Sequence, residues 1–466
     1  MSFKRKVLAA SIALALAAPL GAQAADNAEL AQIREQIKQM KEGYEARIQA
    51  LEKRLQQAES TAGSALDKAG KAEEKAVQAA AAPVASPSAS ASAFNPEISL
   101  ILSGTYANLS QDPAKYRIAG FLPNGGEIGP GQRGFGLGES ELAVAANIDP
   151  YLRGQFTLAV TPEDTVAVEE AFVQSLGLGN GLTVKGGRFL SGVGYLNEQH
   201  AHTWDFVDAP LAYQAFFGGQ FKDDGIQMKW LAPTDTFVEL GAEVGRGRNF
   251  PASNRAKNGF GSAALFAHLG GDVGVSHSWR AGLSMLRTSP RNRTYSITDN
   301  LNVAVDNSFR GDSRLEIADF VWKWAPNGNP VFTNFKLQGE YFRRHEDGNL
   351  TYDTGAASAG TGTDRYTSAQ SGGYLQGVYQ FMPRWRAGLR RDQMDGGSVD
   401  YAANSANLGQ AAYNPSKNSL MFDYSPSEFS RFRLQFAQDK SRPEATDNQM
   451  FLQYQMSLGA HGAHKY

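Results

Sequence analysis

The stretch MFLQYQMSL at residues 450–458 decides the fold class of this chain. Its even-numbered positions carry Met, Leu, Tyr, Met and Leu, whereas its odd-numbered positions carry two Gln and one Ser beside Phe451. Successive side chains of a β-strand point to opposite faces, so one face of this strand is apolar and the other mostly polar. The alternation recurs at residues 431–436, where Phe432, Leu434 and Phe436 alternate with two arginines and a glutamine. This period of two predicts β-strands with one face in an apolar environment.

Residues 1–24 have the pattern of a secretory signal peptide. The basic start KRK (4–6) precedes a short apolar run (7–20) and the small-x-small cleavage site AQA (22–24). The apolar run is too short for a membrane-spanning helix. The chain contains no cysteine, which excludes disulfides and thiolate metal sites. We therefore expect an exported protein.

Residues 25–78 predict a helix. Apolar side chains recur at steps of three and four, first at Leu30, Ile33 and Ile37 and again at Leu51 and Leu55. A narrow, sustained apolar stripe is typical of a coiled coil, with a single amphipathic helix as the alternative. Residues 79–93 are rich in Ala, Pro and Ser without any period, and predict a linker.

From residue 94 to residue 466 the period of two returns, and we predict about sixteen strands. They lie near 97–109, 139–149, 151–160, 167–176, 182–189, 224–231, 236–245, 262–270, 275–287, 314–325, 332–345, 371–382, 384–394, 417–425, 429–439 and 447–458.

The connections between these predicted strands alternate between short and long. The long ones are 110–138, 190–223, 246–261, 288–313, 346–370 and 395–416, and the exceptions are 161–166 and 440–446. Short turns on one side and long loops on the other are typical of outer-membrane β-barrels. Unpaired backbone cannot face lipid, so such a sheet must close. The predicted fold is an all-β transmembrane barrel of about sixteen antiparallel strands, preceded by a periplasmic α-helical coiled coil.

The predicted wall has an apolar outer face and a charged inner face. Outward positions include Leu142, Leu240, Phe320 and Tyr341. The predicted pore-lining residues are Arg153, Lys185, Lys229, Lys323, Lys336, Arg344, Arg384, Arg386, Arg390, Arg431, Arg433, Glu141, Glu239, Glu243, Asp319, Glu340, Asp392 and Asp423. With about sixteen strands the lumen is too wide for wall side chains to fill, which predicts an aqueous channel. The basic excess favours anions, unless the charges pair across the wall.

The long connection 190–223 is rich in rings and polar groups, which predicts a loop that folds inward and narrows the channel. Its candidate constriction residues are Tyr195, Trp204, Asp205, Asp208, Phe216 and Phe217. The alternative is an external loop packed on its neighbours.

His200 and His202 flank one alanine in this loop. On an extended segment they share a face, where two neutral imidazoles could bind Zn²⁺ or Cu²⁺. A second pair, His461 and His464, lies near the C-terminus, so four of the seven histidines are paired. The alternative is chance spacing, and the sequence does not identify a third ligand.

Other functions find little support. The chain has no Gly-x-Ser-x-Gly, His-Glu-x-x-His or Walker motif, so we expect no enzyme and, zinc apart, no cofactor. The net charge of −2 argues against nucleic acid as a partner.

The block VKGGRF at 184–189, continued by Ala209-Pro210-Leu211 and Phe216-Phe217, resembles the phosphate-selective porin O/P family. The resemblance implies a sixteen-stranded trimeric porin, and the DcaP-like type of trimeric porin also carries a periplasmic coiled coil. The segments 195–217 and 456–466 are similar to a proteobacterial group labelled zinc-regulated or TonB-dependent outer-membrane receptors.

We therefore expect a porin of the Gram-negative outer membrane, with its N-terminal segment in the periplasm. It would pass small hydrophilic solutes or ions by passive diffusion with a weak anion preference, as a homotrimer surrounded by lipid. Two alternatives stay open. One is a zinc- or metal-linked uptake receptor, and the other is a structural tether whose coiled coil contacts peptidoglycan.

Overall fold

The computed structural model describes residues 38, 53, 96–122, 128–160, 165–253, 256, 258–409 and 412–459. The chain divides into two compact units, Met1–Ala93 and Phe94–Tyr466. In the first unit only Lys38 and Lys53 are described, and both are helical. The predicted signal peptide, coiled coil and linker otherwise lie outside the described residues, and so do His461 and His464.

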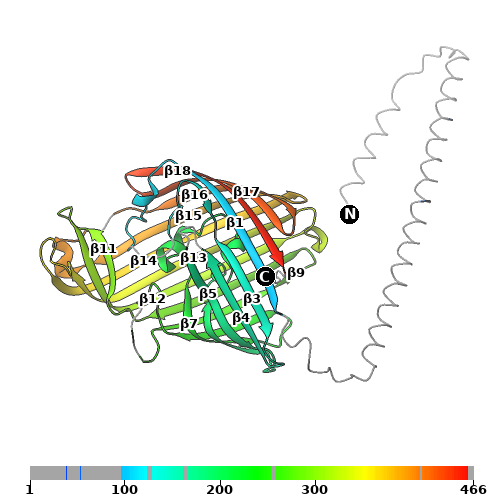
Figure 1. Ribbon diagram of the computed structural model, residues 1–466, viewed down its shortest axis with the longest axis horizontal. Coiled ribbons are helices and arrows are strands. Elements are labelled where there is room, and N and C mark those ends of the chain that lie inside the picture. Colours follow the sequence, from blue (N-terminus) through cyan, green and yellow to red (C-terminus); the bar gives the residue numbers. More distant parts are fainter. Residues whose placement is uncertain are drawn as a thin grey trace, which may run out of the picture. The chain divides into compact units, whose positions relative to one another are not determined.

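The second unit is an antiparallel β-barrel (Figure 1). Its strands are β1 (Glu97–Leu109), β2 (Gly134–Leu137), β3 (Ser140–Asn147), β4 (Leu152–Val160), β5 (Val166–Ser175), β6 (Leu182–Leu190), β7 (Lys222–Leu231), β8 (Phe237–Gly245), β9 (Ser262–Val273), β10 (His277–Thr288), β11 (Arg293–Thr298), β12 (Ala304–Trp324), β13 (Asn334–Tyr352), β14 (Gly362–Met382), β15 (Trp385–Asp400), β16 (Ser416–Ser427), β17 (Ser430–Arg442) and β18 (Ala445–Gly459). The helical segments are η1 (Pro113–Lys115), η2 (Ala201–Thr203), α3 (Leu211–Phe217), η3 (Pro326–Gly328) and η4 (Ala402–Ala406).

The sheet closes between its first and last strands. β1 and β18 pair from Ser99 opposite Gly459 to Leu109 opposite Gln449. β2 and β3 both pair with β1, and β10 and β11 both pair with β12, so each couple forms one interrupted strand of the wall. The wall therefore has sixteen strands, as predicted. At the break before β3 a side chain on Gly138 would collide with the Ser103 hydroxyl.

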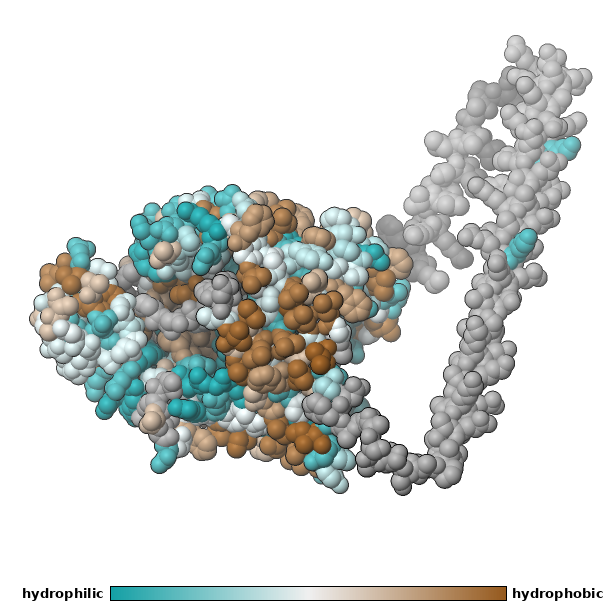
Figure 2. All heavy atoms as spheres, viewed as in Figure 1, coloured by the Kyte–Doolittle hydropathy of each residue, from teal (hydrophilic) through white to brown (hydrophobic). Residues whose placement is uncertain are grey.

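The outer wall is apolar over the part of the barrel nearer the short turns. Leu142, Phe320 and Tyr341 are 39%, 43% and 54% exposed, as predicted for outward positions. Figure 2 shows apolar surface gathered where Figure 1 labels β1, β3 and β5. No helix among the described residues is both long enough and apolar enough to cross a membrane.

Strands β12 to β15 extend beyond their predicted ends at the long-loop side. There the polarity of the two faces inverts: Arg310 and Arg314 point outward, while Phe309 and Tyr352 are fully buried. The buried residues form an apolar cluster of Tyr295, Val305, Phe309, Leu350, Tyr352, Tyr366, Tyr401 and Leu408. This part of the barrel buries its apolar face inward, as a β-sheet in water does. The predicted long loops 288–313 and 346–370 are therefore largely strand, and β15 extends six residues into the predicted loop 395–416.

Candidate functional site

The connection between β6 and β7, residues 191–221, lies inside the barrel. Val193, Leu211 and Phe216 are fully buried. The loop contacts inward-facing wall residues such as Glu340, whose neighbour Tyr341 points outward. This placement agrees with the predicted inward loop 190–223 and excludes an external one.

The short helix α3 holds the apolar part of the loop. It begins after Pro210, where the Leu211 amide donates to Asp392 Oδ1 at 2.9 Å, and ends at Gly218, which has a left-handed φ of 72°. Left-handed backbone favours glycine, so Gly218 lets the chain turn back towards β7.

The loop builds an apolar core within the lumen. Phe216 stacks on Phe342 of β13 with 5.9 Å between ring centroids, and Tyr213 packs edge-on at 5.2 Å from the same ring. Inward-facing Leu286 and Met394 of the wall join this cluster. Leu286 and Met394 therefore interrupt the inner face of the wall, which we predicted to be polar.

The structure adds detail to the predicted constriction. The rings of Tyr195, Trp204, Phe216 and Phe217 are at most 7% exposed, so they pack within the loop and against the wall and do not line water. The wall side chains alone do not fill a sixteen-stranded lumen, and the loop occupies part of the remaining space at its level. The constriction is therefore a packed core inside the barrel.

Glu340 of β13 anchors the start of the loop. Its carboxylate accepts hydrogen bonds from the amides of Tyr195 and Leu196, each at 3.0 Å, and from the hydroxyls of Tyr213 at 2.9 Å and Tyr374 at 2.7 Å. On the neighbouring wall the Glu243 carboxylate accepts from the Gly192 amide. A carboxylate with several donors is well satisfied in a buried position.

Two aspartates fix the middle of the loop to strands β13, β15 and β16 of the wall. Asp205 contacts Lys336 Nζ at 2.5 Å and Arg386 at 3.2 Å. Burial by itself would raise the pKa of Asp205, but the charges of Lys336 and Arg386 outweigh it and hold the pKa well below its usual range. Asp205 therefore remains ionised at neutral pH.

Asp208 forms the second of these clamps. Its carboxylate contacts Lys417 Nζ at 2.7 Å and Arg390 at 3.0 Å, and accepts from Gln435 at 2.8 Å. Burial again acts to raise the pKa of Asp208, and the two cations lower it well below its usual value. Lys417 was not among the predicted pore-lining residues, although its parity on β16 matches theirs.

Most predicted pore-lining residues face the lumen, but many are paired. Lys229 contacts Glu198 of the loop and lies 3.6 Å from Glu239. Arg386 also binds Asp423 of β16 at 2.5 Å. Elsewhere Arg153 binds Glu97 at 2.6 Å, and Lys185 lies 4.4 Å from the Phe172 ring centroid. The alternative that lumen charges pair thus holds for these residues.

Arg384 is a wrong prediction. It lies in the turn between β14 and β15, exposed and with a φ of 73°, because β15 begins only at Trp385. The period of two runs through the turn in sequence, but the backbone there reverses direction.

Three inward arginines bind neutral oxygens. Arg433 donates to the Trp204 carbonyl at 2.6 Å, and Arg431 donates to the His202 carbonyl at 2.7 Å. Arg344 donates to Gln370 Oε1 at 2.5 Å and lies 5.2 Å from the Phe216 ring centroid. Within the part of the chain that the structure describes, none of the three forms an ion pair with a carboxylate.

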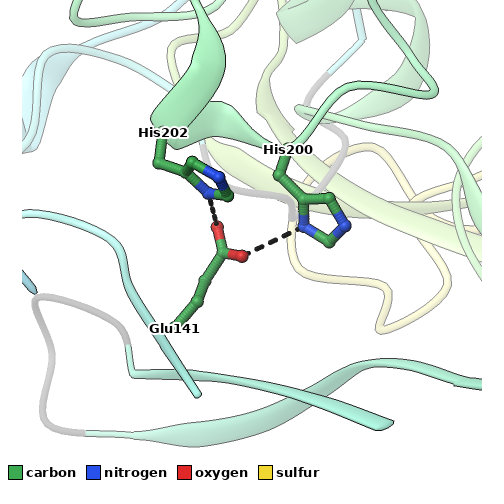
Figure 3. A group of neighbouring side chains, drawn as sticks. All are labelled: Glu141, His200 and His202. Atoms are coloured by element: carbon green, nitrogen blue, oxygen red, sulfur yellow. Dashed lines mark hydrogen bonds and ion pairs between the residues drawn. The ribbon is translucent and has the colours of Figure 1, made fainter. Parts of the chain in front are cut away.

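The predicted histidine pair meets carboxylates of the wall (Figure 3). Glu141 of β3 bridges the two rings: its oxygens lie 2.9 Å from His202 Nδ1 and 3.1 Å from His200 Nδ1. Glu169 and Glu170 of β5 lie 3.0 Å from Nδ1 and 3.1 Å from Nε2 of His200. One ligand atom each from Glu141, His200 and His202 lie within 4.8 Å of one another, a spacing that could hold a metal ion.

Sequence reasoning had placed Glu141 in the lumen but missed Glu169 and Glu170. A β-bulge explains the omission: Thr157 pairs with Glu170 and Leu158 with Val168, so Glu169 is the extra residue of β5. A bulge lets two consecutive side chains approach one site, against the strict alternation of a regular strand. Two adjacent glutamates in a predicted strand were the available signal.

Comparisons with known proteins place the chain in a family. It is 30% identical over 405 residues to a protein of Aquifex aeolicus (strain VF5) described as uncharacterized, and the match covers 80% of each chain. The chain belongs to the same family as that protein. No family model matches the chain.

Similar solved structures include three outer-membrane proteins. They are a loop L8 deletion mutant of OmpT from Vibrio cholerae (11% identical, 78% of this chain and 99% of that chain, TM-score 0.47), the outer membrane channel DcaP of Acinetobacter baumannii (11%, 78% and 97%, 0.45) and an anion-selective porin from Comamonas acidovorans (12%, 78% and 99%, 0.44). These similarities are too remote to carry a function to this chain, whose own geometry has to supply it.

Proposed function

We propose that this family member is an outer-membrane channel through which small hydrophilic solutes diffuse passively. One observation carries the proposal: the closed sheet presents apolar residues outward and charged residues inward. In water such a wall would expose its apolar face, whereas in a bilayer that face is covered by lipid and the inner face stays hydrated. The inward loop 191–221 sets the narrowest level of the channel.

The orientation follows from the connections. Short turns and both barrel ends, Glu97 and Gly459, lie on one side of the wall, which in outer-membrane barrels is the periplasmic side. The long strands β12 to β15, with charged outer faces, then project outside the cell. With this orientation we propose that the N-terminal segment lies in the periplasm. The resemblance to trimeric porins supports a homotrimer with lipid around it.

The selectivity that we propose is a weak preference for anions. Arg431 and Arg433 bind carbonyl and amide oxygens, so no carboxylate in direct contact among the described residues neutralises their positive charges, and these charges contribute to the electrostatic potential at that level. Loop residues Asp205 and Asp208 neutralise the other basic residues near them. The preference is therefore weaker than the count of lumen arginines and lysines suggests.

Planar-bilayer recording tests the channel and its selectivity. The purified protein should give stable conductance, and its reversal potential in a KCl gradient should show a modest anion preference. R431Q/R433Q should shift the reversal potential towards cations, whereas R365Q, which removes an exposed arginine paired with Asp347, should not. Absence of conductance from folded protein would refute the channel. Equal reversal potentials in all three proteins would refute the role of the two arginines.

A further inference from the structure

We propose that the lumen contains a binding site for one divalent transition-metal ion, at the point where the loop meets β3 and β5. Glu141, His200 and His202 would supply the ligands, and Glu169 would complete the set. Imidazole nitrogens together with carboxylate oxygens suit Zn²⁺ and similar ions. The ligand set does not include the arginines of the proposed ion preference, although Arg431 also donates to the carbonyl of His202.

The ligand spacing is close to that of a coordination shell. Two ligands bound 2.0–2.1 Å from a tetrahedral ion lie about 3.3 Å from each other. The Nδ1 atoms of His200 and His202 lie 2.9–3.1 Å from the oxygens of Glu141, and His200 Nδ1 lies 3.0 Å from Glu169. These nitrogen–oxygen contacts differ by a few tenths of an ångström from the distance between two ligands of one tetrahedral ion.

The charge of the cluster also favours a cation. Three carboxylates, those of Glu141, Glu169 and Glu170, are at most 6% exposed and all contact one imidazole. Lys185 acts electrostatically on Glu170, but its ammonium also lies over the Phe172 ring. A divalent ion held by Glu141 and Glu169 balances their two charges directly.

The two imidazoles are held in place by contacts from other parts of the barrel. The carbonyl of His202 accepts from Arg431 at 2.7 Å and from Gln455 at 3.0 Å, and the carbonyl of His200 accepts from Thr203 Oγ1 at 2.9 Å. The rings stack with 5.7 Å between centroids. The loop backbone is thus fastened to β17 and β18, while the rings reach β3 and β5. Contacts from residues outside the ligand set orient metal ligands before the metal binds.

Of the cluster, the ring of His200 is the part most open to solvent. The side chain of His200 is 19% exposed, whereas those of Glu141 and Glu169 are 3% and 2% exposed behind it. Glu139 lies close to the site as well, because its carboxylate falls within 4.8 Å of the carboxylates of Glu141 and Glu169. A bound ion would tie the start of the loop to the wall, and so hold the constriction in one position.

The test is zinc titration of the purified full-length protein, produced without a polyhistidine tag and stripped of metal by chelator. Calorimetry gives the number of Zn²⁺ ions per chain and the affinity, and Co²⁺ substitution reports nitrogen and oxygen ligands through its visible absorption. The variants are H200N/H202N and E141Q. The matched control is H461N/H464N, which removes the other histidine pair of the chain. Heat-modified gel mobility checks that each barrel is folded.

We expect one Zn²⁺ that wild type and H461N/H464N both bind and that H200N/H202N does not. Groups outside a ligand set change metal affinity by about 10- to 100-fold, so loss of the Glu141 carboxylate should weaken binding at least about tenfold. No ion in folded wild type, or an ion retained in H200N/H202N, overturns the proposal. If H200N/H202N does not fold, unchanged affinity in E141Q overturns it. Since binding is measured without conductance, this outcome is independent of the proposed channel function.

Discussion

The substitution D208N tests whether the loop is clamped inside the barrel by charge. Asp208 lies between Lys417 at 2.7 Å and Arg390 at 3.0 Å, and the side chains of these two cations are 2% and 1% exposed. Asparagine has nearly the same size and keeps one acceptor oxygen, but it removes the negative charge. The two cations would then stay buried with less compensation.

The structure sets the size of the effect. Breaking a buried ion pair by removal of one partner costs about 3–5 kcal/mol. Arg390 keeps Asp392 at 3.0 Å and Lys417 keeps Asp439 at 3.4 Å, so the lower end, about 3 kcal/mol, applies. Each 1.4 kcal/mol is a factor of ten, so the ratio of docked to undocked loop should fall by about a hundredfold. The cost falls on docking, because the strand hydrogen bonds of the wall do not involve Asp208.

Hydrogen–deuterium exchange measures this docking equilibrium. Amides of residues 204–217 should exchange up to about a hundredfold faster in D208N, while those of β13 should be unchanged. Single-channel conductance should rise or become noisier, because an undocked loop leaves the lumen wider. D347N is the control: it breaks the exposed Arg365 pair at 2.9 Å and should cost no more than about 1 kcal/mol. If the loop amides of folded D208N exchange at the same rates as those of wild type, the clamp is refuted.

Other consequences of the structure can be measured in the same preparations. F216A removes a fully buried ring from the lumen core and should cost about 3–5 kcal/mol of loop docking, seen as faster exchange at residues 211–217 with the wall unchanged. The depressed pKa of Asp205 stabilises the docked loop above the unfolded-state pKa of about 3.9, and this contribution is lost as pH falls through the lower folded pKa. The difference in conductance between wild type and D205N should therefore stay constant from about pH 7 to pH 4 and shrink only below that range, and a difference that already shrinks near pH 6 would contradict the Asp205 clamp. Leu283, 69% exposed on the outer face of β10, should face lipid, so L283R should cost about 2–4 kcal/mol in denaturant titration of the barrel refolded into vesicles, and no loss would contradict a lipid-covered face. Deletion of residues 25–78 should weaken the proposed trimer in gel electrophoresis while leaving a folded barrel, and an equally stable trimer would argue against a coiled-coil role.

The strands of the wall were the most predictable part of the molecule. β1 matches its predicted range, 97–109, and the sixteen-strand count is confirmed. A strand in a bilayer must turn apolar side chains outward and can keep polar ones inward, so the fold leaves a period of two in the sequence itself. The ends of β12 to β15 were not predicted, because a sheet in water turns its apolar face inward. There Phe309 points inward and Arg310 points outward.

The inward course of the loop was also predictable, but its packing was not. The density of rings between residues 195 and 217 indicated a constriction, yet whether a ring lines water or lies in a core depends on the facing wall. Phe342 of β13 and Met394 of β15 are more than a hundred residues away in sequence. Only closure of the sheet brings them opposite α3.

The sequence by itself determined the class of fold and which residues of each strand face inward, because alternation along a strand is a local pattern that repeats through the barrel. It also singled out His200 and His202 as candidate ligands, because their spacing is visible in three consecutive residues. What only the tertiary structure decided is which charges meet. The pairing of Asp208 with Lys417 joins residues 209 positions apart, and the approach of Glu169 to His200 depends on a bulge in β5. Such contacts are set by the register and closure of the barrel, and alternation along a single strand carries no information about them.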